Sequence, residues 1–212
     1  MPTFNGTGFD MDQQERITCM KDAFFFGYGS LVNRATHDYG QARVASLPGW
    51  RRAWRHTALR PVAFLTAEPD PTTMIEGLIA AVPGSDWAAL DAREAAYDRH
   101  PVSETVQHDL SPRPPVSVYA IPQANRRAPT EAFPVLLSYL DVVVQGYARE
   151  FGADGVARFF ATTTGWEAPI LDDRASPIYP RHQRLSTAER AMTDAHLHSL
   201  GARIITTRPP GL

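Results

Sequence analysis

The sequence predicts an α+β fold, in which a mixed and largely antiparallel β-sheet closes toward a small barrel and is flanked by helices, with a helical C-terminal third. Strand-like runs separated by turn residues fill about the first two-thirds of the 212 residues. From about residue 131 the pattern changes to helical periodicity. Hydrophobic residues make up 43% and charged residues 21%, which is typical of a globular protein with a substantial core. Strands first and helices later argue for the α+β class.

Six runs in the first two-thirds are predicted as strands because apolar and β-branched residues dominate them and turn signals separate them. These strands are 24–28, 42–47, 60–67, 75–82, 102–110 and 116–121. Between the fourth and the fifth, residues 84–97 are predicted as a helix, with Gly84, Ser85 and Asp86 as its start signals.

The C-terminal part is predicted to hold three helices, over 131–152, 154–164 and 186–202. Ser186 and Glu189 match the capping-box pattern at the start of the last one. The segment 165–184 between the last two is rich in loop signals. Its charged residues 172–174 are open to local pairing, to capping of a neighbouring element or to substrate binding, and local pairing is favoured.

Residues 1–22 are polar and lack the apolar core of a signal peptide, so we predict a flexible N-terminal arm. The remainder, 23–212, is predicted as a single domain, with a boundary near 124–130 as the alternative. The apolar run 24–26 is far too short to span a bilayer. We therefore expect a cytoplasmic protein with no membrane partner, and the sequence makes no prediction of its oligomeric state.

The formal net charge is −2 at pH 7, which gives no electrostatic reason to expect nucleic acid or an anionic membrane as a partner. Cys19 is the only cysteine, which excludes an intrachain disulfide and a cysteine-based zinc site. The histidines show no ligand spacing, so we expect no metal and no cofactor. Arg51, Arg52 and Arg55 cluster around two tryptophans, and we interpret them as a solvated strand edge rather than as a nucleic-acid site.

A glycine-flanked turn, Gly-Tyr-Gly-Ser-Leu at 27–31, follows the first predicted strand. It is not a dinucleotide fingerprint, because Val32 stands where the third glycine is needed. It is not a nucleophile elbow around Ser30 either, because Tyr28 and Val32 occupy the flanking glycine positions. Two interpretations stay open: backbone N–H groups that converge on an anion, or a tight strand exit at which Gly29 permits a positive φ.

The helix predicted over 84–97 carries an acid on its apolar stripe. The stripe has the 3–4–3 spacing of a buried helical face and consists of Trp87, Leu90, Glu94 and Tyr97. Burial beside aromatic rings would raise the pKa of Glu94 toward the range that a general acid or base needs. The alternatives are an ion pair with Arg93 or Arg99, or an exposed position at the edge of the stripe.

Taken together, the turn Tyr-Gly-Ser-Leu at 28–31 and the pattern L-D-x-x-E-x-x-Y-x-R at 90–99 resemble the γ-glutamylcyclotransferase family and its ChaC-like relatives. Two further segments, 48–54 and 75–82, stand in the order and rough spacing of that family. The resemblance covers residues 24–121, and the helical tail matches only loosely. One departure is that Val32-Asn33 follows the turn, whereas animal γ-glutamylcyclotransferases have Asn directly after Ser.

The resemblance implies that a γ-glutamyl group cyclises to 5-oxoproline and releases an amine, an amino acid or a peptide. Glu94 would be the catalytic residue, taking a proton from the substrate α-amine and returning it to the leaving amine. Substrate binding would fall to Tyr28, Gly29, Ser30 and Leu31, which would hold the α-carboxylate, and to Tyr119, which would border the pocket. The chemistry needs no metal and no cofactor. Glutathione, γ-glutamyl amino acids and γ-glutamylamines all remain open as substrates.

Two other functions compete with this hypothesis. One is a non-catalytic member of the same fold that binds a small ligand or a partner protein. A carboxylic acid at position 94 speaks against it, because a pure binding pocket gains nothing from a buried base. The other is a hydrolase that uses Ser30 as nucleophile, and no recognisable motif positions a histidine beside it.

Overall fold

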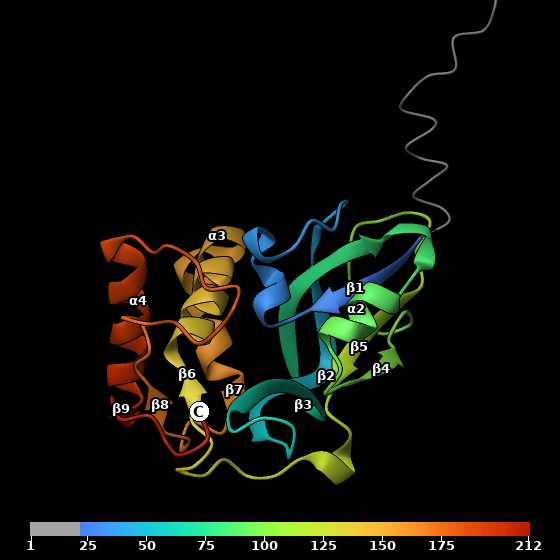
Figure 1. Ribbon diagram of the computed structural model, residues 1–212. Helices are drawn as coiled ribbons and strands as arrows, with labels where there is room; N and C mark the ends of the chain where they lie inside the picture. Colours follow the sequence, from blue (N-terminus) through green and yellow to red (C-terminus); the bar gives the residue numbers. More distant parts are fainter. Residues whose placement is uncertain (1–21) are drawn as a thin grey trace, which may run out of the picture.

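The computed structural model describes residues 22–212, so the predicted flexible arm lies outside the described residues apart from Asp22 (Figure 1). The strands are β1 (Ala23–Gly27), β2 (Arg43–His56), β3 (Ala63–Val82), β4 (Asp98–Pro101), β5 (Val116–Ala120), β6 (Val135–Leu136), β7 (Thr163–Thr164), β8 (Ile170–Leu171) and β9 (Ile204–Ile205). The α-helices are α2 (Ala88–Arg93), α3 (Leu137–Ala161) and α4 (Thr187–Ser199). None of the helices in this described part is both long and apolar enough to cross a bilayer, and the cytoplasmic location stays a prediction.

The main sheet has six strands in the order β4-β5-β1-β3-β2-β7. β1 runs parallel to β5 and β2 parallel to β7, whereas the other neighbouring pairs are antiparallel. The predicted α+β class with a mostly antiparallel sheet is therefore confirmed. The expected closure toward a barrel is not observed, because no pairing joins the short edge strands β4 and β7 within residues 22–212. The short parallel strands β6, β8 and β9 form a second sheet.

The hairpin of β2 and β3 is much longer than predicted. β3 has 20 residues and joins the predicted strands 60–67 and 75–82 into one. Proline at 69 and 71 hides this continuity in the sequence, because proline lacks the N–H that strand pairing uses. β2 has 14 residues, and its register shifts between Pro48 and Trp50, where Gly49 has a φ of +80°.

The predicted strand over 102–110 is a loop. The N–H groups of Thr105 and Val106 both donate to the carbonyl of Val102, which closes a turn instead of extending the chain. Beyond this turn, Gln107 makes an isolated bridge to Ser46 of β2. The apolar pattern arises because Val102 and Val106 reach the core from a turn, so the strand prediction was wrong here.

The C-terminal part mixes helices with short strands and is not purely helical. Helix α3 has 25 residues and spans both helices predicted between 131 and 164, but it begins only at Leu137 because β6 precedes it. The two predicted helices meet at Gly152, which has a φ of +67° inside α3. The capping box of α4 is confirmed: Ser186 Oγ accepts from Glu189 N–H at 3.2 Å, and Glu189 Oε2 accepts from Ser186 N–H at 2.7 Å.

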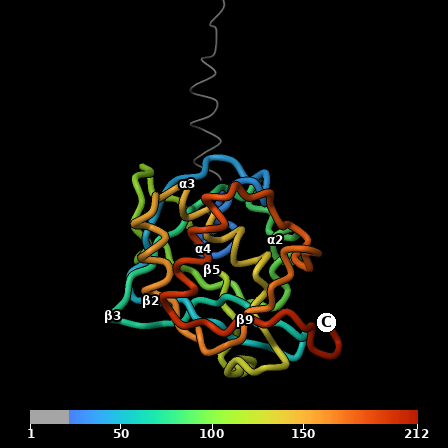
Figure 2. The backbone as a smooth tube through the Cα atoms, turned by 90° about the vertical axis from the view of Figure 1, so that its left-hand side faces the viewer, coloured from blue at the N-terminus to red at the C-terminus, as the bar shows by residue number. Residues whose placement is uncertain are grey.

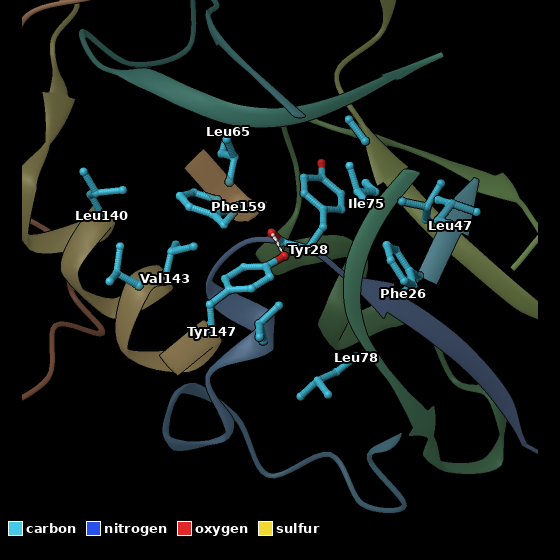
Figure 3. Packing of buried hydrophobic residues seen from close by; sticks show 14 of the residues in the cluster. Phe26, Tyr28, Leu47, Leu65, Ile75, Leu78, Leu140, Val143, Tyr147 and Phe159 are labelled. Atoms are coloured by element: carbon cyan, nitrogen blue, oxygen red, sulfur yellow. Dashed lines mark hydrogen bonds between the residues drawn. The ribbon is translucent and has the colours of Figure 1, made fainter. Parts of the chain in front are cut away.

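Strand β1 is buried on both faces, which explains its three consecutive phenylalanines. Phe24 and Phe26 belong to a large core cluster that includes Tyr147 of α3. Phe25 points to the opposite face and packs in a second cluster with Leu90 of α2. Figures 1 and 2 show α3 and α4 side by side at one side of the molecule, and Figure 3 shows the larger cluster between α3 and the sheet. The chain that leaves β1 therefore starts from a rigid position.

Candidate active site

The turn after β1 leaves no room for side chains at its two glycines. Gly29 has a φ of −115°, so the interpretation that Gly29 permits a positive φ is wrong. A Cβ atom at Gly29 would lie 2.6 Å from the hydroxyl oxygen of Tyr139 in α3. A Cβ atom at Gly27 would lie 2.5 Å from the Cβ of Leu31. Close packing therefore leaves no space for a side chain at either glycine.

The residues of the turn line a small cavity. Ser30–Val32 form a 3₁₀ turn, in which the first donating N–H belongs to Val32 and bonds to the Gly29 carbonyl at 3.0 Å. The amides before Val32 have no acceptor inside the turn, as at the start of any helix. All four residues predicted to bind substrate here, Tyr28, Gly29, Ser30 and Leu31, line a cavity of about 30 Å³, called the inner cavity below. Successive amides of this kind suit an anionic group.

Buried hydrogen bonds from distant parts of the chain hold Tyr28 in place. Its hydroxyl donates to the carbonyl of Tyr119 at 2.6 Å. Its carbonyl accepts from Arg52 Nε at 3.3 Å and from the Tyr147 hydroxyl at 3.0 Å (Figure 3). Burial raises the pKa of Tyr147 to about 12, so its hydroxyl remains a donor at neutral pH.

The arginine cluster at 51–55 differs from the predicted solvated edge. The Arg52 side chain is buried and also donates to the Glu76 carbonyl at 2.6 Å and to the Tyr147 hydroxyl at 2.5 Å. Arg51 pairs with Asp70, and Arg55 pairs with Glu68. The prediction failed at Arg52 because its partners are far away in the sequence and give no local signal.

Glu94 lies at the end of α2 and faces the inner cavity together with the turn at 28–31. The helix is shorter than the predicted 84–97, and the Glu94 N–H closes its last turn by donating to the Leu90 carbonyl at 2.9 Å. The Glu94 side chain is 17% exposed and forms an ion pair with Arg93, with 3.2 Å between Nε and Oε1. Burial raises the pKa of Glu94 above its usual value, and the charges of Arg93 and Arg181 oppose this rise. Glu94 therefore lies at a cavity, as expected, and also forms the ion pair with Arg93 that was the alternative.

Arg93 joins Glu94 to the glycine turn. Besides its ion pair, its guanidinium donates from Nη2 to Ser30 Oγ at 3.2 Å and from Nη1 to the Thr36 carbonyl at 3.1 Å. The side chain is only 9% exposed, so these contacts are protected from water. Arg99, the other expected partner of Glu94, pairs instead with Asp91 and lies over the Trp87 ring. Arg93 thus fixes the carboxylate relative to the turn.

Tyr119 of β5 borders the inner cavity, although its hydroxyl is engaged elsewhere. That hydroxyl donates to the carboxylate of Asp91 in α2. Its carbonyl accepts the hydrogen bond from Tyr28 described above. Tyr119 is therefore placed to hold the turn through its backbone.

A larger cavity of about 490 Å³, called the outer cavity below, continues from Glu94. Ser30, Leu65, Glu94, Tyr97 and Tyr139 line both cavities. Burial raises the pKa values of Tyr97 and Tyr139 well above the usual range, so both hydroxyls are neutral. The Tyr97 hydroxyl donates to the Leu65 carbonyl at 2.9 Å.

Three cavity residues have no signal in the local sequence: Tyr139, Tyr179 and Arg181. Tyr139 belongs to α3, and its ring packs edge-on against that of Tyr179, with 5.0 Å between centroids. The segment 165–184 brings the other two to the cavity. The favoured local pairing is wrong for Asp173 and Arg174, whose capping and ion-pair partners lie on the neighbouring helices. Asp173 accepts from the Ser138 N–H at 2.7 Å, which is the expected alternative of capping a neighbouring element, and Arg174 pairs with Asp141 of α3 and Asp194 of α4.

The arrangement defines a class of site in which one largely buried carboxylate and a glycine-flanked turn line the same cavity. No group of three or more His, Cys, Asp or Glu side chains in residues 22–212 is arranged to hold a metal ion. A family model described as ChaC-like protein matches residues 23–166. The chain therefore belongs to the ChaC-like family.

Solved structures share the fold at low sequence identity. An uncharacterised human protein superposes with a TM-score of 0.51 and 14% identity, over 82% of this chain and 99% of the other. A gamma-glutamyl cyclotransferase superposes with a TM-score of 0.50 and 14% identity, over the same shares of the two chains. A yeast gamma-glutamyl cyclotransferase specific to glutathione has 16% identity over 86% of this chain and 97% of its own, but its TM-score of 0.42 adds nothing to the fold argument. No curated protein matches the sequence.

Proposed function

We propose that this protein is a γ-glutamyl cyclotransferase, which converts a γ-glutamyl compound into 5-oxoproline and a free amine, amino acid or peptide. The observation that carries the proposal is that Glu94 and the turn at 28–31 line one inner cavity. Membership of the ChaC-like family and a fold shared with a gamma-glutamyl cyclotransferase support it.

The reaction assigns one task to each side of the inner cavity. The amides of residues 29–31 and the Ser30 hydroxyl bind the α-carboxylate of the glutamyl group. Its α-ammonium group lies toward Glu94, which accepts a proton from it. The neutral nitrogen then attacks the γ-carbonyl carbon and forms a tetrahedral intermediate. As the bond to the leaving nitrogen breaks, Glu94 returns the proton to that nitrogen. The ring nitrogen still carries one extra proton, which passes through Glu94 to the released amine. The products are then a neutral lactam and an ammonium group, so atoms and charges balance.

The pKa values suit this transfer. A free α-amino group titrates at about 7.7–8.0, so at neutral pH it must lose a proton before it attacks. A carboxylate whose pKa is raised by burial is a better acceptor for that proton than one in water. Because attack is intramolecular, fixing the glutamyl conformer can lower the barrier by up to about 7–11 kcal/mol.

One contact argues against a hydrolase with Ser30 as nucleophile. The side chain that bonds to Ser30 Oγ is Arg93, and a guanidinium cation cannot accept the hydroxyl proton. In this scheme Ser30 is a binding group.

The test measures 5-oxoproline formation from glutathione, γ-glutamyl amino acids and γ-glutamylamines. We expect product from at least one class, and a loss of about 10²- to 10⁴-fold in kcat/KM for the Glu94→Gln variant. The matched control is Glu104→Gln, which changes an exposed acid outside both cavities. No product from any compound would overturn the proposal in favour of a non-catalytic binding protein. Full activity of Glu94→Gln would overturn the role of Glu94.

A further inference from the structure

The outer cavity lies where the leaving group of the reaction must go. Glu94 lines both cavities and returns the proton to the leaving nitrogen in the proposed reaction. The inner cavity is bordered by the turn that binds the α-carboxylate. The part of the substrate beyond the scissile bond therefore extends into the outer cavity, whose lining decides which leaving groups fit.

The walls of the outer cavity beyond Glu94 are mostly apolar. They include Leu59, Val62, Phe64, Ile178, Tyr179 and Pro180. A peptide group placed there would give up its hydrogen bonds to water with few replacements, which is costly. A large apolar side chain in the same place would gain from burial. At about 490 Å³, the cavity lies in the size range of small-molecule sites.

Two exposed arginines also line the outer cavity. They are Arg60, in the connection between β2 and β3, and Arg181, in the segment that follows β8. Neither forms a salt bridge with another residue in the described range 22–212. Arg181 lines the same cavity as Glu94, and its charge lowers the pKa of Glu94. Arginine is well suited to bind a carboxylate through two hydrogen bonds.

From this lining we infer that the preferred substrates are γ-glutamyl dipeptides whose second residue is a large apolar or aromatic amino acid with a free α-carboxylate. The apolar walls take the side chain, and Arg181 takes the carboxylate. Glutathione fits less well, because its leaving group carries a peptide bond and no large apolar side chain. This inference rests on the proposed cyclotransferase function and adds the substrate class to it.

The first experiment compares kcat/KM for 5-oxoproline formation from γ-glutamylphenylalanine, γ-glutamylglycine, glutathione and γ-glutamylphenethylamine. We expect γ-glutamylphenylalanine to exceed γ-glutamylglycine and glutathione by at least about tenfold. We also expect it to exceed γ-glutamylphenethylamine, which has the ring but no carboxylate, by at least about tenfold. Equal or better turnover of glutathione would overturn the inference and leave the proposed function intact. No product from any compound would overturn both.

Two variants test the two parts of the outer cavity. Leu59→Glu adds a carboxylate to the apolar wall at a side chain that is 65% exposed, and Val44→Glu is its control at an exposed position of β2 outside the cavity. Leu59→Glu is expected to lower the ratio of kcat/KM for γ-glutamylphenylalanine over γ-glutamylglycine by about tenfold. An unchanged ratio would overturn the apolar part of the inference.

Arg181→Gln removes the proposed carboxylate partner, and Arg190→Gln on α4 is the control for loss of an exposed charge. Arg181→Gln is expected to lower the ratio of kcat/KM for γ-glutamylphenylalanine over γ-glutamylphenethylamine by about tenfold, whereas Arg190→Gln leaves that ratio unchanged. If Arg181→Gln lowered kcat/KM equally for γ-glutamylphenylalanine and γ-glutamylphenethylamine, Arg181 would not bind the carboxylate of the leaving group. That result would overturn this part of the inference.

Discussion

Replacing Gly29 with alanine puts a methyl group where the structure has no space for one. The new Cβ would lie 2.6 Å from the Tyr139 hydroxyl oxygen and 3.5 Å from Leu65 Cδ2. The φ of Gly29 is −115°, so the expected loss of stability in Gly29→Ala is attributed to this overlap and not to a positive φ. Overpacking of this kind costs about 1–3 kcal/mol, and each kcal/mol lowers Tm by about 2–4 °C in a chain of this length.

Tyr139→Phe removes the atom that would overlap with the new methyl group. The Tyr139 ring packs between Trp54 and Tyr179, with 5.9 Å and 5.0 Å between ring centroids, so it cannot easily swing aside. Alone, Tyr139→Phe removes the hydrogen bond between the Tyr139 hydroxyl and the Ser30 backbone and is expected to cost about 1 kcal/mol. In the double variant the two changes are expected to compensate, with a coupling energy of about 1–2 kcal/mol.

Urea unfolding followed by circular dichroism gives the free energy of unfolding for all four proteins of this cycle. We also expect kcat/KM of Gly29→Ala to fall by more than about tenfold and to recover partly in the double variant, because small displacements of binding groups lower rates strongly. Two results would refute the reasoning: a Gly29→Ala protein as stable as the wild type, or changes in stability that add within about 0.5 kcal/mol.

Three further predictions concern the groups that support the site. Arg93→Leu removes a charge that lowers the pKa of Glu94, so the acidic limb of the pH profile of kcat/KM moves to higher pH, and a limb at the wild-type position would contradict this. Arg52→Leu removes the buried hydrogen bonds that Arg52 donates to the Tyr28 and Glu76 carbonyls. It is expected to lower the free energy of unfolding in urea by more than about 2 kcal/mol, whereas the control Arg190→Leu changes it by less than about 0.5 kcal/mol. Asp173→Ala removes the acceptor for the Ser138 N–H at the start of α3. It is expected to cost about 1–2 kcal/mol of stability and so to lower Tm. An unchanged Tm would show that water replaces the Asp173 carboxylate as the acceptor.

Local sequence patterns predicted the parts of the site that lie on one element. The glycine turn follows a strongly apolar strand, and Glu94 interrupts an apolar helical stripe, so both are visible within about a dozen residues. The fold class was predictable for the same reason, since strand-like and helical patterns occupy different parts of the chain. The ends of the strands were not predictable. Pro69 and Pro71 interrupt the strand pattern in the sequence, whereas pairing with β2 keeps β3 continuous in the structure.

The connections between elements could not be predicted from single segments. Arg93 contacts Ser30 across 63 positions, and Tyr139 limits the side chain at Gly29 from a helix that begins more than a hundred residues later. The local sequence around Arg52 predicts a surface arginine. In the folded chain its side chain donates hydrogen bonds to the Tyr28 carbonyl and to the Tyr147 hydroxyl. The roles of Arg93, Tyr139 and Arg52 depend on contact partners that are far away in the sequence and come close only in the folded chain.

The long-range hydrogen bonds of Tyr28 have a consequence for when the protein becomes active during folding. Its hydrogen bonds join Tyr28 to residues 24, 91 and 119 positions away, at Arg52, Tyr119 and Tyr147. Contacts of such high sequence separation form late, because long loops must close before they are made. A fragment that ends before α3 would retain Glu94 and the glycines but lack the Tyr147 hydroxyl that holds the Tyr28 carbonyl. Enzymatic activity should therefore return after secondary structure during refolding, as a marker of the completely assembled chain.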